Sequence, residues 1–245
     1  MKTLKLNTIL KSIALILAFT ALSCYDDDTT IIIDRDLASK DAEELIAISL
    51  SYDTYGLVAH FDHIGQEIEN ISECDVTNTD TQIETGNINS NYDYIYTFTE
   101  VFTLYCEPEL YLEYALEGDL EFDAYNFEEI QQININFTTT GLEDISDEEI
   151  YNGNYNTTGE MQSDFNNNTY EYSYDSTIFD IRVNKESNKI VSGSVTFSLV
   201  QTYSRNNLTY TYNGTIEFLN ENAAEVTFDN GEVFVVDINN VSISN

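Results

Sequence analysis

The sequence predicts a mainly β protein: an antiparallel meander of about nine or ten strands, preceded by two helices. Three observations favour this fold class. Between positions 38 and 72, apolar residues recur every three or four positions, which is the period of a helix with one buried face. From position 91 the period changes to two, which is typical of strands with one face in a core and one in water. Turn-forming residues separate the alternating runs.

Two helices are predicted at the start of the folded part. The first covers 38–50, where Ser39 is the expected N-cap and acidic residues occupy the first turn, as the helix dipole favours. The second follows the sequence "SYDTYG" and carries an apolar stripe made of Leu57, Phe61, Ile64, Ile68 and Ile71. We therefore expect the helical segment to end near residue 72.

The clearest strands are predicted between 91 and 123. The first places one set of apolar residues on a single face: Tyr92, Tyr94, Tyr96, Phe98, Phe102 and Leu104. Glu100 interrupts this face, so we expect either a bulge or sheet edge there, or a functional carboxylate. The next run alternates apolar and acidic residues. Its phase continues across Gly118, which fits one long strand or a hairpin with a three-residue loop.

Further alternating runs complete the predicted sheet. They cover 133–137, 170–174, 179–183, 191–203 and 208–218, followed by a pair around Asn230-Gly231, a dipeptide typical of tight hairpins. Two segments rich in turn-forming residues, 146–149 and 152–160, are predicted loops. A sandwich, an open curved sheet and a barrel all agree with this order.

Residues 1–23 have the features of a secretory signal peptide. Lysines at the start are followed by an apolar run of about 11 residues, which is too short to span a bilayer. Small residues then lead into Cys24, a pattern that resembles the lipobox of bacterial lipoproteins. The resemblance implies that Cys24 becomes the acylated first residue of the mature chain. A plain cleaved signal with an accidental cysteine is the alternative.

The residues after Cys24 carry a second resemblance. The sequence "CYDDD" is similar to the export signal of Bacteroidota-type surface lipoproteins, with Asp26, Asp27 and Asp28 as its acidic part. It implies a lipid-anchored protein of the bacterial outer membrane that faces the cell exterior; a simple polar tether is the alternative. We therefore divide the chain into a signal at 1–23, an acylated cysteine and acidic tether at 24–37, and one β-rich domain at 38–245.

Cys74 and Cys106 are the expected disulfide, because an even pair of cysteines in an exported chain favours a bridge. This bridge would join the helical segment to the sheet and stabilise the fold by about 3–4 kcal/mol in the loop-entropy model.

The charge of the chain restricts its partners. Its 44 acidic and 9 basic residues give a formal net charge of −35. Such a field repels phosphate backbones, so we do not expect direct nucleic-acid binding. Solubility in a salty exterior explains the acidity; binding of Ca²⁺ or another divalent cation is the alternative. No other cofactor is indicated.

One group of residues has metal-ligand character. The chain has 2 histidines, His60 and His63, and Glu67 follows them at helical spacing. On a helix these three side chains would share a face and could hold a metal. The spacing differs from the His-Glu-x-x-His zinc motif, and two structural histidines on an amphipathic helix explain the pattern equally.

No catalytic pattern is present in the sequence, which lacks a Gly-rich phosphate loop and a Gly-x-Ser-x-Gly elbow. We therefore expect a non-enzymatic, membrane-anchored surface lipoprotein that acts as a binding or structural module toward a glycan, a protein or an apolar ligand. The alternative is a carrier or chaperone for an apolar molecule on a curved sheet. A carboxylate-based hydrolase has less support, since no pair of acids can be singled out. The residues expected to line the carrier's sheet face are Tyr92, Tyr94, Phe98, Leu110, Leu112 and Tyr114.

Overall fold

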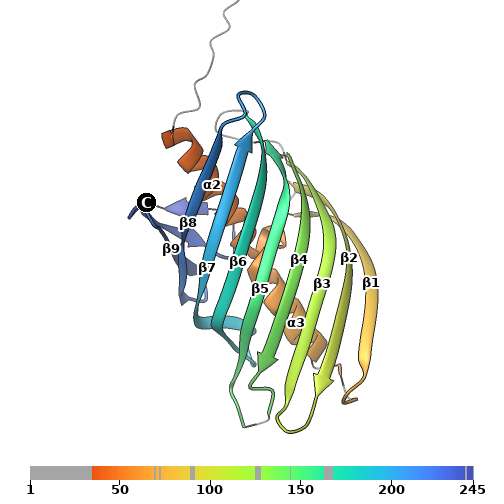
Figure 1. Cartoon of the computed structure of the whole chain (residues 1–245). Helices are drawn as coiled ribbons and strands as arrows, with labels where there is room; N and C mark the ends of the chain where they lie inside the picture. The colour runs from red at the N-terminus through yellow and green to blue at the C-terminus, as the bar shows by residue number, and fades with distance from the viewer. Residues whose placement is uncertain are drawn as a thin grey trace, which may run out of the picture. The chain divides into compact units, whose positions relative to one another are not determined.

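The structure, a computed structural model, describes residues 35–68, 70–71, 73–88, 92–124, 128–143, 145–162, 168–240 and 242–244. All of them belong to one unit, which starts at Arg35. In this unit a large antiparallel sheet curves around two helices (Figure 1). The predicted signal peptide, Cys24 and the acidic triplet 26–28 lie outside the described residues.

Eleven strands form one sheet in the described part of the chain, and each strand pairs with its neighbours in sequence. The sheet is open, because β1 and β11 lie at its two edges and do not pair with each other. The predicted antiparallel meander is therefore confirmed, and it takes the form of an open curved sheet. The strands are β1 (Thr77–Ile88), β2 (Tyr92–Tyr105), β3 (Tyr111–Ala124), β4 (Glu128–Thr140), β5 (Glu148–Gln162), β6 (Thr169–Asn184), β7 (Lys189–Tyr203), β8 (Thr209–Asn220), β9 (Ala223–Phe228), β10 (Val233–Asp237) and β11 (Ser242–Ser244).

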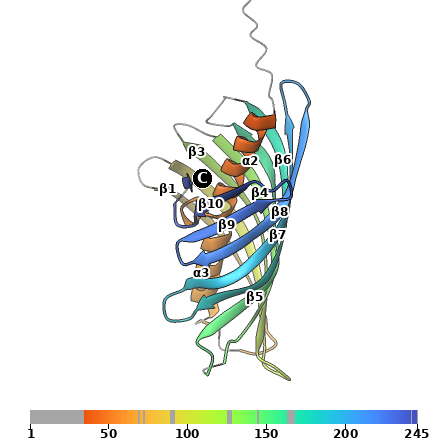
Figure 2. The ribbon, with the colours of Figure 1, turned by 90° about the vertical axis from the view of Figure 1, so that its left-hand side faces the viewer.

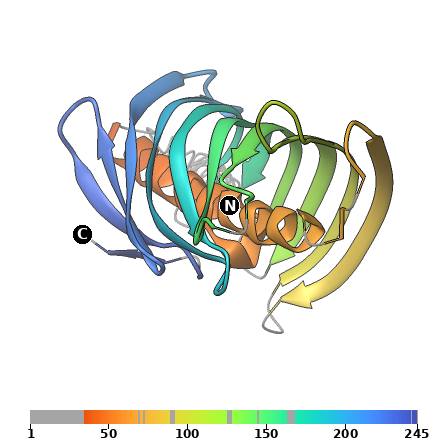
Figure 3. The same ribbon diagram turned by 90° about the horizontal axis from the view of Figure 1, so that it is seen from below.

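The two predicted helices are confirmed and lie in the concave face of the sheet (Figures 2 and 3). They are α2 (Arg35–Leu50) and α3 (Leu57–Ile68), joined through a short 3₁₀ turn, η1 (Tyr52–Thr54). No helix among the described residues is long and apolar enough to cross a membrane.

Helix α2 differs from its prediction at its start and in its surroundings. It begins at Arg35, so the last residues of the predicted tether are helical. Ser39 lies inside the helix and does not cap it; its hydroxyl donates a hydrogen bond to Glu232 at 3.1 Å. Every side chain from 41 to 50 is buried, including Asp41, which accepts a hydrogen bond from the Tyr203 hydroxyl at 2.6 Å. The curved sheet therefore encloses α2, and a sheet tyrosine bonds the buried Asp41 carboxylate.

Two strands of the sheet, β1 and β5, were not predicted. Strand β1 was not predicted, because its polar residues show no alternation and most of its side chains are exposed at the sheet edge. The predicted loop at 152–160 belongs to β5. Its Asn, Gly and Thr residues are turn formers by composition, but Tyr151 and Tyr155 are buried in the core. Gly153, with a φ of +148°, lies next to the register shift between β5 and β6.

Strand β3 runs unbroken through Gly118, so the long-strand alternative holds and the hairpin alternative does not. The Asn230-Gly231 hairpin between β9 and β10 is confirmed. The predicted runs 170–174 and 179–183 belong to one strand, β6. A bulge after Phe179 shifts the register, so that Ile181 lies on the buried face although Phe179 is exposed.

The sulfur atoms of Cys74 and Cys106 lie at bonding distance, and their Cα atoms are 5.7 Å apart. Cys74 precedes β1 and Cys106 follows β2, so this bridge fastens the ends of the edge hairpin to each other. The expectation that it would join the helices to the sheet was wrong, because α3 ends before Cys74.

Candidate binding pocket

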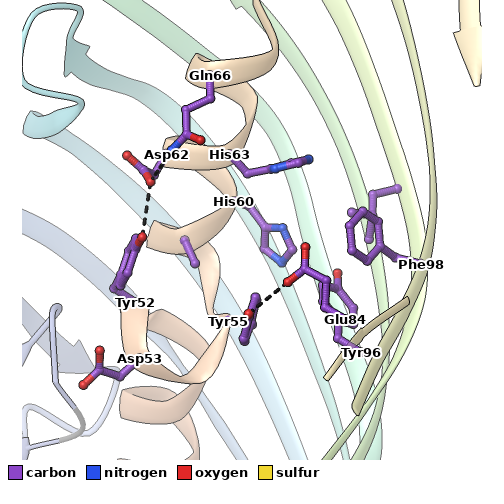
Figure 4. Close-up of a pocket in the computed structure, with 12 residues that line it drawn as sticks. Tyr52, Asp53, Tyr55, His60, Asp62, His63, Gln66, Glu84, Tyr96 and Phe98 are labelled. Atoms are coloured by element: carbon purple, nitrogen blue, oxygen red, sulfur yellow. Dashed lines mark hydrogen bonds between the residues drawn. The ribbon is translucent and has the colours of Figure 1, made fainter. Parts of the chain in front are cut away.

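A pocket of about 320 Å³ lies beside α3, between that helix, η1 and strands β1 to β3 (Figure 4). Its volume is in the range of small-molecule sites. Aromatic, acidic and imidazole side chains dominate the lining, which consists of Tyr52, Asp53, Tyr55, Ala59, His60, Asp62, His63, Gln66, Glu84, Tyr96, Phe98 and Leu116.

The turn between η1 and α3 places Tyr55 at the pocket. Tyr55 adopts a left-handed conformation, with a φ of 54°, and its N–H donates to the Tyr52 carbonyl oxygen at 3.2 Å. At Gly56 a Cβ atom would come within 2.7 Å of the carbonyl oxygens of Ile48 and Ser49, so only glycine fits this close approach to the end of α2. The chain can therefore reverse here and start α3 against the edge of the sheet.

Aromatic rings form one wall of the pocket. The Tyr55 ring lies 5.4 Å from that of Tyr96, and Tyr96 lies 4.6 Å from Phe98, centroid to centroid. The Tyr55 hydroxyl donates to Glu84 Oε2 at 2.9 Å and lies 2.7 Å from the Tyr94 hydroxyl. Burial raises the pKa of Tyr55 and of Tyr96, so both remain neutral hydroxyls at physiological pH.

Glu100 explains the interruption in the apolar face of β2. No bulge occurs there, because Glu100 pairs in regular register with both neighbouring strands, so that expectation was wrong. The carboxylate is 1% exposed, and its Oε2 atom lies 2.9 Å from His63 Nε2 and accepts a hydrogen bond from Tyr114 at 3.0 Å. The hydrogen bond to Glu100 raises the pKa of His63. Glu100 therefore favours the protonated form of His63 at the pocket.

The environment of His60 favours the neutral imidazole, in contrast to that of His63. His60 is 3% exposed, and burial lowers its pKa to about 3, with the charge of His63 as a smaller cause. A hydrogen bond between the imidazole and the Tyr55 backbone raises the pKa slightly. This direction indicates that the ring donates to the Tyr55 carbonyl oxygen, because a hydrogen bond that the ring accepted would lower the pKa. Its Nε2 atom is buried and has no hydrogen-bond partner among the described residues. The ring is therefore neutral, with Nε2 as a bare acceptor.

Tyr96 carries the second unsatisfied group at the pocket. Its side chain is 2% exposed, and its hydroxyl has no hydrogen-bond partner in the part of the chain that the structure describes. Buried polar atoms without partners are uncommon in folded proteins, and each calls for a water, an ion or a ligand. His60, Tyr96 and the Glu84 carboxylate point toward one another in Figure 4.

The predicted metal ligands do not form a metal site. His63 Nε2 faces Glu100, whereas His60 Nε2 is buried without a partner, so the two imidazoles do not share an ion with Glu67. Over the described ranges, no group of three or more His, Cys, Asp or Glu side chains is arranged to hold a metal ion. The helical spacing was right, but the sheet beneath α3 gives each histidine a different environment.

The chain matches no family model, no curated protein and no solved structure. Function is therefore inferred from the residues of the pocket. Sequence reasoning found the two histidines and Glu100, but it missed Tyr55 and Glu84. Tyr55 lies in the segment between the two predicted helices, to which no role was assigned, and Glu84 lies on the unpredicted edge strand β1.

Proposed function

We propose that this protein is a lipid-anchored binding module of the bacterial cell surface and that the pocket beside α3 is its binding site. The observation that carries the binding role is the presence of two buried polar atoms without partners, His60 Nε2 and the Tyr96 hydroxyl, at one pocket. A ligand that bonds both atoms would regain the hydrogen bonds that folding leaves unmade.

The pocket lining supports binding over covalent catalysis. Among the described residues that line it, none is a serine, threonine or cysteine that His60 or His63 could activate as a nucleophile. His63 is engaged by Glu100, and the low pKa of His60 leaves it a weak base. These residues can orient a ligand without transferring a group to it.

The anchor half of the proposal depends on Cys24 and the acidic triplet after it. Acyl chains gain about 0.8 kcal/mol per buried CH₂ group, and more than one chain gives stable attachment. The net charge of −35 would hold the body of the protein away from an anionic bilayer. Metabolic labelling with a palmitate analogue tests this: the parent chain should be labelled and the Cys24→Ser variant should not. Equal labelling would exclude the anchor.

The binding half needs a pocket-specific test. The full chain carrying Cys24→Ser would be screened by thermal shift against soluble glycans and small metabolites. Ala59→Phe should fill the pocket, because Ala59 lines it. Ala115→Phe makes the same change on the outward face of β3 and serves as the matched control.

The ligand found should raise the melting temperature of the parent and of Ala115→Phe but not of Ala59→Phe. A ligand that stabilises Ala59→Phe as much as the parent would place its site elsewhere. A screen without any ligand would reject the binding role.

The apolar carrier has less support than a pocket-based module. Phe98, Leu112 and Tyr114, which were expected to line an open sheet face, are at most 3% exposed. They pack in the core on the face that holds the helices, so an apolar molecule along that face would have to displace α2 or α3. Saturable uptake of the neutral dye N-phenyl-1-naphthylamine by the native chain would favour the carrier.

A further inference from the structure

We infer that the pocket beside α3 takes a small organic cation: a protonated amine that carries a short apolar group. The inference rests on the proposed binding role of this pocket and names the chemical class of its ligand. Charge, hydrogen-bonding capacity and shape each support it.

The charged groups at the pocket are mainly negative. Asp53, Asp62 and Glu84 line it, and no lysine or arginine is among the described residues that do so. The hydrogen bonds that reach Asp62 and Glu84 come from neutral groups: Tyr52 and Gln66 donate to Asp62, and Tyr55 donates to Glu84. None of the three groups that donate these bonds carries a positive charge.

His63 does not reverse this field. Its imidazole is the one lining group whose pKa is raised toward a positive charge, but Glu100 Oε2 lies 2.9 Å from its Nε2 atom. The Glu100 carboxylate therefore faces any positive charge that His63 carries. An anionic ligand would face the remaining carboxylates, whereas a cation would be attracted to them.

The buried polar groups at the pocket require a ligand that donates hydrogen bonds. His60 Nε2 can only accept, because the ring is neutral and its other nitrogen bonds the Tyr55 backbone. Glu84 also only accepts. An ammonium group has three donors and no acceptor, so its hydrogen-bonding capacity matches the acceptors His60 Nε2, Glu84 and the Tyr96 hydroxyl oxygen. An ionised carboxylate on a ligand has no donor for these acceptors.

The walls suit both ends of such a molecule. Faces of tyrosine and phenylalanine attract cations through the ring quadrupole, and Tyr55, Tyr96 and Phe98 supply a cluster of such rings. Ala59 and Leu116 add aliphatic surface for a short apolar group. A volume of about 320 Å³ accommodates a ligand of this size.

Isothermal titration calorimetry on the full Cys24→Ser chain tests the inference with three probes of nearly equal shape: benzylamine, benzyl alcohol and benzoate. Benzylamine should bind, benzyl alcohol should bind at least about tenfold more weakly, and benzoate should give no saturable heat. Phenethylamine and hexylamine extend the test to other apolar groups.

Two matched variants place the ammonium group. Glu84→Gln removes the charge but keeps an oxygen for the Tyr55 hydroxyl, and it should weaken benzylamine binding about tenfold. Glu217→Gln makes the same change at an exposed position on β8 and should leave the affinity unchanged. Tyr96→Phe, which removes the unpartnered hydroxyl, should also weaken binding.

Each outcome separates the inference from the proposed function. If benzyl alcohol or a neutral glycan binds as tightly as benzylamine and Ala59→Phe abolishes that binding, the cation inference fails and the binding role stands. Equal loss of affinity in Glu84→Gln and Glu217→Gln would show only general attraction to an acidic surface and would also overturn it. If none of the three amines binds below about 10 mM, the inference is rejected, and the thermal-shift screen decides the binding role independently.

Discussion

Glu129 supplies the sharpest prediction about stability. It points from β4 into the core, is 1% exposed, and accepts a hydrogen bond from the Tyr172 hydroxyl at 2.6 Å through Oε1. Its Oε2 atom has no hydrogen-bond partner among the described residues. Burial raises the pKa of this carboxyl from 4.5 to about 7, although the bond from Tyr172 acts in the opposite direction. The folded protein therefore prefers the protonated, neutral form.

The sign of the pH dependence follows from linkage. Between pH 4.5 and about 7 the folded chain binds the Glu129 proton more tightly than the unfolded chain does. The stability associated with this proton is fully present below pH 4.5 and is lost as the pH rises through about 7. The complete loss corresponds to about 3 kcal/mol of the free energy of unfolding.

The substitution Glu129→Gln removes the titration and keeps the size of the side chain. Relative to the parent, this variant should gain about 2–3 kcal/mol of stability between pH 5 and pH 8. Urea denaturation followed by far-ultraviolet circular dichroism measures this difference in the full Cys24→Ser chain. Comparing variant with parent at each pH cancels the titration of the other 43 acids, since the chain has 44.

Glu171→Gln is the matched control, because Glu171 is exposed on β6, which lies beyond β5 in the same sheet. Its effect should stay within about 0.5 kcal/mol at both pH values. A difference between Glu129→Gln and the parent that does not change between pH 5 and pH 8 would refute the reasoning. The carboxyl would then be ionised in the core or solvated by water that lowers its pKa.

Three further predictions follow from individual contacts. Tyr96→Phe should raise the free energy of unfolding by about 1 kcal/mol, because the buried Tyr96 hydroxyl has no partner among the described residues. Tyr203→Phe should lower the free energy of unfolding by about 1–3 kcal/mol, because the 2.6 Å hydrogen bond to buried Asp41 is lost. Equal effects of the two substitutions in urea denaturation would contradict both assignments. Replacing Cys74 and Cys106 together by serine should lower the free energy of unfolding by about 3 kcal/mol and increase amide exchange chiefly in β1 and β2. A uniform increase in exchange across the sheet would contradict a stabilising effect confined to this hairpin. Gly56→Ala should cost about 2 kcal/mol or more in thermal or urea unfolding, since its Cβ would meet the backbone of α2; a neutral result would mean that the turn can relax.

The alternation of apolar and polar residues was sufficient to predict the sheet. In β3 the residues Leu112, Tyr114 and Leu116 are buried and Glu113 between them is exposed, as the period of two requires. The same rule failed at β1, where an edge strand has no neighbour on one side and its side chains are mostly exposed. It also failed in β5, where Asn, Gly and Thr are favoured by turns and only inward tyrosines mark the strand.

Tertiary contacts decide what local sequence could not. Three-residue spacing placed His60 and His63 on one face of α3, but the sheet buried one ring and paired the other with Glu100. Glu100 looked like a break in an apolar face because its partners, His63 and Tyr114, come from other elements. Glu84 could be found only after β1 was known to lie beside β2.

The most direct test of the account is a titration of benzylamine into the full Cys24→Ser chain and its Ala59→Phe and Ala115→Phe variants. The account predicts saturable heat in the parent and in Ala115→Phe and none in Ala59→Phe, because only that substitution fills the pocket where His60, Glu84 and Tyr96 meet. Saturable binding of equal strength in Ala59→Phe would contradict it.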